Sequence, residues 1–391
     1  MDMNELRLER ISIFKNAVTG KETPLRVPHY GNFWSWKVLD AGYKLSDALY
    51  NYETYEKVLR HFADNYKMDL VSDLGIRNPL KVTNSLGNTE YKIDDDTGMI
   101  QVNDQCFMEA DEYDQLIKDP RKFIWETVIP RKYPLLREKN NSAAFRTFLE
   151  YQRENSTWTA RYRDIYRDEY GYPSTFAPTQ PSPNNAFEML FTRLRGIVGI
   201  CRDIQKCPDK VLAAIDAMDE AFILPAFARA KSAPKGTNPN TCFDFTMGLL
   251  AHTILSPKQF EKFYWPALKR LMDYAEEYDK IGHIFSEGDS TRFYDFFQEF
   301  PKNRICVVVE MDDVFEMKKK LPHITVGGGM PALLLGTGTP DECVAYAKRL
   351  IDELGYDYHY VFAEDKMMSF HADCKAENLK AVCDYVFAHR Y

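Results

Sequence analysis

The chain has 391 residues, of which 45% are hydrophobic and 28% are charged, a balance typical of a folded globular protein rather than a disordered one. The formal net charge is −8 and no block of Lys or Arg occurs, so no nucleic-acid-binding surface is expected. The first residues lack the apolar segment of a secretory signal and no run of about 18 apolar residues occurs, so the sequence predicts a cytoplasmic protein without a membrane partner.

Four candidate strands, each a short apolar run bounded by turn residues, occur in the first part of the chain. In chain order they cover residues 27–33, 69–75, 174–180 and 240–245. Alternating, turn-rich residues at about 80–110 predict an inserted β-hairpin between the second and third strands. A densely charged helical segment at about 142–172 predicts an outer helix in contact with solvent.

From residue 265 onward, helix and strand patterns alternate regularly. The strand patterns cover residues 281–286, 305–310, 323–329 and 359–364. The helical patterns cover residues 267–278, 290–300, 313–321, 339–355 and 375–390.

This alternation with short loops implies parallel strands joined by right-handed crossovers. With the earlier candidates the strands number eight, so the sequence favours an α/β fold of the (β/α)8 TIM-barrel type over a doubly wound sheet. We expect a single domain over residues 1–391, with extra N-terminal helices and the hairpin inserted at about 80–110.

Polar side chains at strand ends are candidates for catalysis, because the loops after the strands surround the mouth of a barrel. His283 and Glu287 are four residues apart, so both point to one face of an extended strand, and Glu310 ends the next strand. His283, Glu287 and Glu310 are therefore candidate catalytic groups and zinc ligands, since zinc accepts a nitrogen and carboxylate oxygens and can keep a position open for substrate. The alternative is structural, because acids at strand ends often cap the next helix.

The residues around the first strand end could line a pocket for a flat ring: His29, Tyr30, Phe33, Trp34 and Trp36. A cluster of this kind also occurs in ordinary cores. Asp73 and Arg77, at the second strand end, are candidates for an acid and its partner at the substrate, or for a structural ion pair.

Several stretches of the C-terminal half resemble the uroporphyrinogen decarboxylase superfamily, over about residues 185–385. They are LSPKQFEKFYWPALKRLMD at 255–273, HIFSEGD at 283–289, VGGGMPALLLGTGTPDECVAYAKRLID at 326–352 and KAENLKAV at 375–382. The superfamily includes decarboxylases and corrinoid-dependent methyltransferases, so the resemblance also implies a (β/α)8 barrel.

Two branches of the superfamily match the motifs less well than a third. The decarboxylases place an arginine-bearing segment after the first strand, where this chain reads VPHYGNFWSW. The methanol- and methylamine-type methyltransferases bind zinc through a His-x-Cys pair, where this chain reads His283-Ile284-Phe285. FAEDKMMSFHADCKAENLKAV and HIFSEGD resemble the branch that demethylates methoxylated aromatics.

The resemblance therefore implies transfer of a methyl group from a phenyl methyl ether to the cobalt(I) corrinoid of a partner protein. Zinc held by His283, Glu287 and Glu310 would activate the ether oxygen as a Lewis acid. Asp312 or Asp365 could take the place of His283. The chain has no corrinoid-binding DxHxxG stretch, so the corrinoid is expected to arrive with the partner.

Two other functions stay open at this stage. One is a decarboxylase of a small or aromatic carboxylate substrate that uses Asp73 and Arg77. The other is a barrel that binds an aromatic ligand without catalysis.

Overall fold

A computed structural model of the protein describes residues 2–72, 80, 84, 86–137, 141–177, 180–181 and 185–391. Asp73 and Arg77 lie outside the described residues. The first helices are α1 (Met3–Thr19), α2 (Trp36–Asp40), α3 (Leu45–Leu49), α4 (Tyr52–Asn65), α6 (Tyr113–Lys118), α7 (Pro120–Phe123), α8 (Ile129–Lys132) and α9 (Asn141–Asp164). The later helices are α10 (Ala186–Met189), α11 (Gly196–Lys206), α12 (Pro208–Met218), α13 (Leu224–Lys231), α14 (Pro257–Phe263), α15 (Trp265–Glu277), α16 (Tyr294–Phe297), α17 (Val314–Lys320), α18 (Ala332–Thr337), α19 (Pro340–Leu354) and α20 (Ala376–Ala388).

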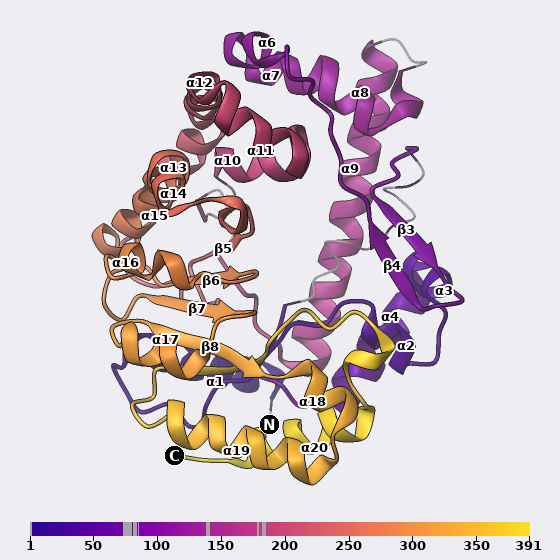
Figure 1. The fold of residues 1–391 in the computed structure, drawn as a ribbon. Coiled ribbons are helices and arrows are strands. Elements are labelled where there is room, and N and C mark those ends of the chain that lie inside the picture. The colour runs from indigo at the N-terminus through magenta and orange to yellow at the C-terminus, as the bar shows by residue number, and fades with distance from the viewer. Residues whose placement is uncertain are drawn as a thin grey trace.

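A parallel sheet with the strand order β5-β6-β7-β8-β9 forms the centre of the C-terminal half (Figure 1). Its strands are β5 (Phe245–Leu249), β6 (Gly282–Ser286), β7 (Ile305–Val309), β8 (Thr325–Met330) and β9 (Tyr360–Glu364). Every residue of β7, with the sequence ICVVV, is buried, as expected of a parallel strand covered on both faces. The strands predicted after residue 265 are confirmed.

Three more parallel segments extend this sheet. β1 (Tyr30–Gly31) pairs with β2 (Leu70–Val71), and a bridge from His29 to Phe362 connects β1 to β9. On the other side, Ser174 bridges Thr241, just before β5. These segments lie within the first three strand candidates of the sequence.

The structure corrects the fourth candidate, and the strands that it describes do not close into a ring. β5 begins at Phe245, where the predicted strand 240–245 ends, because Phe245, Met247 and Leu249 alternate into the core. Within the described ranges no strand pair joins β2 to Ser174. The α/β class with a parallel sheet is therefore confirmed, whereas the closed ring of the predicted barrel is not observed.

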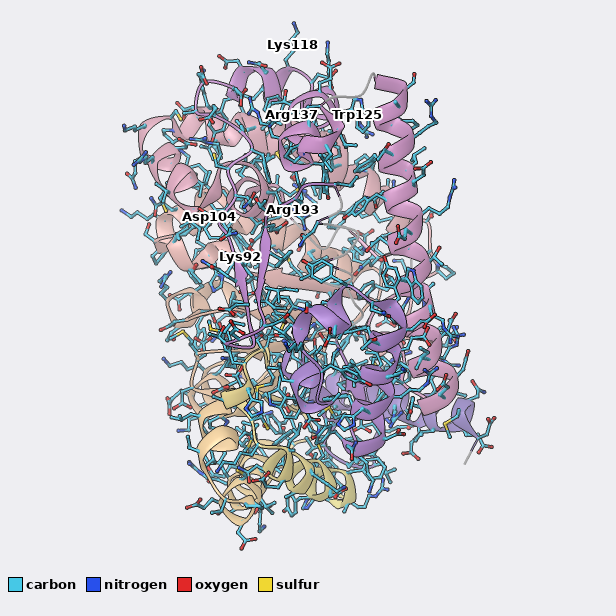
Figure 2. All side chains as sticks on the ribbon, turned by 90° about the vertical axis from the view of Figure 1, so that its right-hand side faces the viewer. Lys92, Asp104, Lys118, Trp125, Arg137 and Arg193 are labelled. Carbon is cyan, nitrogen blue, oxygen red and sulfur yellow. The ribbon has the colours of Figure 1, made fainter. Side chains whose placement is uncertain are left out.

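A hairpin occupies part of the predicted insertion. β3 (Tyr91–Asp94) and β4 (Met99–Val102) pair antiparallel, and the side view in Figure 2 shows Lys92 of this hairpin on the same face as Asp104. The ring of Tyr91 lies 6.0 Å from the ring of Trp34, between centroids. The hairpin is therefore packed against the segment that follows β1.

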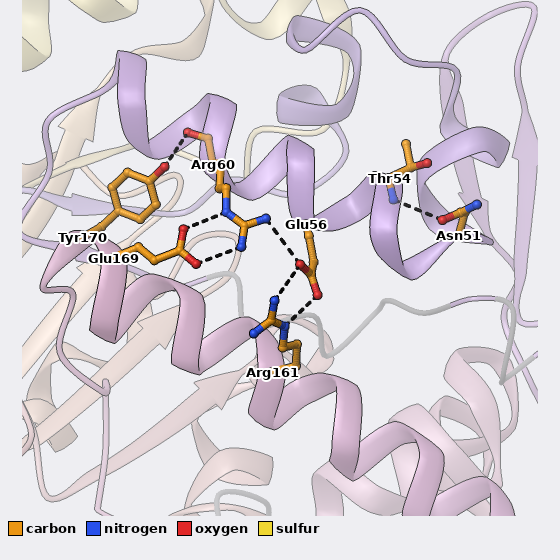
Figure 3. A network of polar contacts seen from close by, with 7 residues as sticks. All are labelled: Asn51, Thr54, Glu56, Arg60, Arg161, Glu169 and Tyr170. Carbon is orange, nitrogen blue, oxygen red and sulfur yellow. Dashed lines mark hydrogen bonds and ion pairs between the residues drawn. The ribbon is translucent and has the colours of Figure 1, made fainter.

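The charged segment at 142–172 forms α9 and a π-helical turn at Ile165–Glu169, on the side of the molecule opposite β6 and β7 (Figure 1). Glu56 of α4 accepts hydrogen bonds from Arg161 of α9 at 2.8 and 3.0 Å and from Arg60 at 3.3 Å. Arg60 also donates to Glu169 at 2.7 and 2.8 Å (Figure 3). These contacts connect α4 to the outer helix.

The parallel strands of the two halves surround an interior that has its own cluster of apolar side chains. Ile11, Phe14 and Val18 of α1 pack with inward-facing strand residues such as Leu70 and Val308. The extra N-terminal helix therefore covers one end of the ring and leaves the other end for a site. No helix in the described part of the chain is both long and apolar enough to cross a bilayer.

Candidate functional site

A cavity of about 260 Å³ lies at the carboxyl ends of the strands, the end at which α/β barrels carry their sites. Its apolar lining comes from Tyr30, Phe33, Trp34, Phe176, Met247, Phe285 and Met367. Its polar lining comes from Asn32, Ser72, Thr175, Thr246, His283 and Glu287. Both halves of the chain therefore build one aromatic cavity that contains a few polar groups.

Trp34 is held in the wall of this cavity by two contacts. Its backbone N–H donates to the carbonyl of Met368 at 2.9 Å, and Tyr91 of the hairpin packs edge-on against its ring. The side chain is only 4% exposed. A flat, fixed indole of this kind can pack against an aromatic ligand at little entropic cost.

His283 is the histidine of the cavity, and its position is set by the sheet. β5 and β6 pair in a register that places Thr246 directly opposite His283, and Thr246 Oγ1 lies 2.9 Å from His283 Nδ1. Nε2 is buried and has no hydrogen-bond partner in the part of the chain that the structure describes. Burial lowers the pKa of His283 to about 4, so the imidazole is neutral at pH 7.

Next to His283, Tyr30 and Ser72 form a second polar group. The ring of Tyr30 lies 4.9 Å from that of His283, between centroids. Burial raises the pKa of the Tyr30 hydroxyl, and a hydrogen bond with Ser72 only partly opposes this, so the phenol stays protonated. Ser72 Oγ in turn donates to Asn32 Oδ1 at 3.4 Å.

The three predicted metal ligands do not form one ligand group. His283 and Glu287 both line the cavity, but Phe285 lies between them, and four extended residues separate Cα atoms by about 13 Å. Glu310 accepts a hydrogen bond from the backbone N–H of Gly288 at 2.8 Å. Among the described residues, no three His, Cys, Asp or Glu side chains could hold a metal ion together.

The two alternative ligands have structural roles in this geometry. Asp312 accepts a hydrogen bond from the backbone N–H of Ser290 at 2.8 Å, and Asp365 accepts one from that of Ala332, the first residue of α18, at 3.0 Å. Burial raises the pKa of both carboxyl groups. Asp312 and Asp365 therefore stabilise the segment after the preceding strand, whereas the structural alternative expected acids at strand ends to cap the next helix.

His29 and Trp36 were expected to bind substrate but do not line the cavity. His29 precedes Tyr30 and so faces the other side of the strand, where its Nε2 lies 3.2 Å from Glu364 Oε1. Trp36 begins α2 and donates from Nε1 to the carbonyl of Cys374 at 2.9 Å. Both side chains are buried in the surrounding core.

Sequence reasoning missed Thr246, Ser72 and Asn32. The predicted strand stopped at residue 245 and so did not include Thr246. Had the strand been extended to Leu249, alternation would have placed Thr246 on the face opposite Phe245, toward the cavity. Ser72 follows β2, and Asn32 lies two residues beyond Tyr30 on the same face. The two-residue spacing from Tyr30 could have predicted that Asn32 faces the cavity.

Comparisons with known proteins agree with this architecture. Residues 186–389 match the uroporphyrinogen decarboxylase (URO-D) family. No curated protein sequence matches the chain. A solved structure described as a methyltransferase from Methanosarcina mazei superposes with a TM-score of 0.60 over 99% of this chain and 98% of that chain, at 14% sequence identity, which shows a shared fold.

Proposed function

The chain belongs to the uroporphyrinogen decarboxylase family, and from that premise we propose that it is a methyltransferase. It moves the methyl group of a methoxylated aromatic compound to a corrinoid carried by a partner protein. The observation that carries this proposal is the aromatic cavity with the neutral His283 in its wall.

The size and lining of the cavity favour a single aromatic ring. A cavity of about 150 Å³ can hold benzene, so about 260 Å³ suits one ring with substituents and is small for a tetrapyrrole. Its described lining residues include no Lys or Arg, which a substrate with many carboxylates would need. Both points disfavour the tetrapyrrole substrate for which the family is named.

The reaction requires that a methyl carbon–oxygen bond breaks and that phenolate leaves. The corrinoid, when delivered in its cobalt(I) state, supplies the nucleophile that accepts the methyl group. His283 donates a hydrogen bond from the buried imidazole to the ether oxygen and stabilises the negative charge that develops there. A neutral histidine suits this role, because an electrostatic donor does not need to be charged.

The aromatic residues orient the ring during this step. Trp34 and Phe285 line the cavity from opposite halves of the chain, so a ring between them directs its ether oxygen toward His283. The ring of Tyr30, whose hydroxyl stays protonated, packs beside the imidazole. Together these side chains exclude water from the leaving oxygen.

Zinc stays a prediction, and His283, Glu287 and Glu310 do not fit it as one ligand set. No step above depends on it. Elemental analysis of the purified protein, with a Glu287→Ala, Glu310→Ala double variant as the comparison, tests it directly. Zinc at one ion per chain that is lost in the variant would require a rearrangement of these two carboxylates.

The partner would approach the end of the strand ring at which the cavity lies. Met311 follows β7 and Leu333 lies in α18 after β8, and their side chains are 71% and 76% exposed. A protein that docks over this end would cover these two side chains.

The test is a methyl-transfer assay with a reduced corrinoid protein and a panel of methoxylated aromatics. We expect methylation of the corrinoid, followed by absorbance, together with an equal amount of the demethylated phenol, and strong loss of both in a His283→Ala variant. His252→Gln is the matched control, because His252 is a buried histidine that does not line the cavity. Release of carbon dioxide from an aromatic carboxylate without a corrinoid partner would instead favour the decarboxylase.

A further inference from the structure

Thr246 and His283 form an isolated polar pair inside the cavity wall. The β5–β6 register sets the two residues directly opposite each other, with Thr246 Oγ1 2.9 Å from His283 Nδ1. The strand at Thr246 is itself held, since its backbone N–H donates to Gln180 Oε1 at 3.0 Å. The pair is therefore fixed by backbone pairing and not only by side-chain packing.

Within the described ranges, the imidazole has only this one hydrogen bond. The rings of Tyr30 and Phe243 lie at centroid distances of 4.9 and 5.2 Å from that of His283. Among the described residues, Nε2 has no hydrogen-bond partner, and His283 is the only side chain that forms a hydrogen bond with the Thr246 hydroxyl. Each proton of the pair is therefore donated either within the Thr246–His283 hydrogen bond or to a group in the cavity.

Counting protons distinguishes the two neutral tautomers. If Nδ1 carries the proton, it donates to Thr246, but the Thr246 O–H then has no acceptor and Nε2 presents only a lone pair. If Nε2 carries the proton, the Thr246 O–H donates to Nδ1, and Nε2–H is the single group left for a ligand. The second arrangement leaves fewer buried polar groups unsatisfied and is therefore favoured.

We propose that Thr246 is a positioning residue that fixes His283 as the Nε2–H tautomer, so that the cavity presents a hydrogen-bond donor to its ligand. This inference rests on the proposed function for its consequence: the ligand group at this point is an acceptor oxygen, such as that of a methyl ether. The tautomer itself can be measured without substrate.

The experiment uses the full-length protein labelled with ¹⁵N-histidine, with the His283 signals assigned by their loss in a His283→Gln variant. At pH 7 we expect a pyrrole-type Nε2 and a pyridine-type Nδ1 for His283. Thr246→Val removes the hydroxyl at nearly constant volume and should give a mixture of tautomers, whereas Thr246→Ser should restore the wild-type spectrum. A proton on Nδ1 in the wild type, or an unchanged spectrum in Thr246→Val, would overturn the proposal.

Kinetics supply the second readout. In the methyl-transfer assay, Thr246→Val should lower kcat at least fivefold with less than a twofold change in KM, and Thr246→Ser should recover most of the loss. Wild-type Nε2–H without methyl transfer from any aromatic ether would refute the proposed function and leave the tautomer assignment intact. If Thr246→Val does not fold, the wild-type spectrum together with Thr246→Ser still decides the tautomer.

Discussion

The two walls of the cavity are built in different ways. The wall with Thr246, His283 and Glu287 belongs to β5 and β6, strands of five residues in a continuous parallel sheet. The wall with Tyr30 and Trp34 comes from β1, a strand of two residues, and from the loop after it, and is supported by the β3–β4 hairpin. Only the first wall lies within the residues that match the family.

This difference suggests a division of labour between the walls. Sheet register fixes a side chain to within a fraction of an ångström, which suits a group that must meet a reacting atom. Loops supported by an inserted hairpin can change without disturbing the sheet, which suits recognition of the ring. We therefore expect changes in the first wall to alter chemistry and changes in the second wall to alter binding.

The largest expected effect is on the first wall. His283→Ala should lower kcat by about 10²- to 10³-fold, because it removes a donor that acts on the leaving oxygen. Binding of the aromatic ligand, measured by calorimetry, should change far less. Loss of binding with an unchanged kcat would reverse the assignment of the two walls.

A related effect concerns stability and pH. Burial lowers the pKa of His283 and of His252 to about 4, whereas a histidine in the unfolded chain titrates near 6.5. Between these values the unfolded chain binds a proton that the folded chain does not, so stability falls as the pH drops from about 6.5 to 4. Each histidine should contribute about 3 kcal/mol to this loss.

The measurement is urea unfolding at pH 7 and pH 4.5 for the wild type, His283→Gln and His252→Gln. Each variant should show a smaller loss between the two pH values than the wild type. The quantity to compare is the loss of stability in each variant relative to the loss in the wild type. Buried acids with a raised pKa, such as Glu188, stabilise the folded chain as the pH falls and so offset part of the loss in every protein. Equal losses in all three proteins would contradict neutral burial of these histidines.

A substitution in the second wall should alter the affinity for the aromatic ligand. Trp34→Ala should weaken binding of a methoxylated aromatic by about 10- to 100-fold, since a fixed aromatic surface is lost. At saturating substrate, kcat should stay within a few-fold of the wild type. Trp36→Phe is the matched control, because Trp36 lies outside the cavity, and unchanged affinity in Trp34→Ala would remove the second wall from recognition.

Much of the fold could be predicted from local patterns. The runs IGHIFS and ICVVVE are apolar and bounded by turns, so their strands could be located within about a residue. The start of β5 could not, because apolar residues alternate from Phe243 to Leu249 across NTCFDF and the following TMGLL, and pairing with β6 decides which part is strand. Closure of the ring depends on long-range pairing between β2 and the segment at Ser174, which no local pattern encodes.

The site was predictable in part for the same reason. Alternation along β6 correctly turns His283 and Glu287 toward the cavity. The same alternation places Phe285 between them, and the rise of about 3.3 Å per residue separates their Cα atoms by about 13 Å, so the sequence already argued against a shared ion. Trp34 and Trp36 look equivalent in the sequence, and only the start of α2 directs the second indole toward Cys374.

The smallest expected effect lies outside both walls, in the charged network that connects α4 to α9 (Figure 3). Glu56 is the centre of this network, with a side chain 13% exposed between Arg60 and Arg161. Glu56→Gln should lower the free energy of unfolding by about 1 kcal/mol at low salt, because a partly exposed network contributes little more than an exposed pair. Added salt should reduce the difference, since screening weakens the ion pairs that the wild type keeps.

Urea unfolding at two salt concentrations measures this effect, with Lys348→Gln as the control for an exposed i,i+4 pair, that of Lys348 with Asp352, which shares no further ion pair among the described residues. The control should show no measurable change at either concentration. A large, salt-independent loss in Glu56→Gln would mean that α4 depends on this carboxylate for its packing. In that case α9 would help to shape the second wall, because α4 packs behind the segment that carries Trp34 through the contact of Phe62 with Phe33 at 5.0 Å between ring centroids.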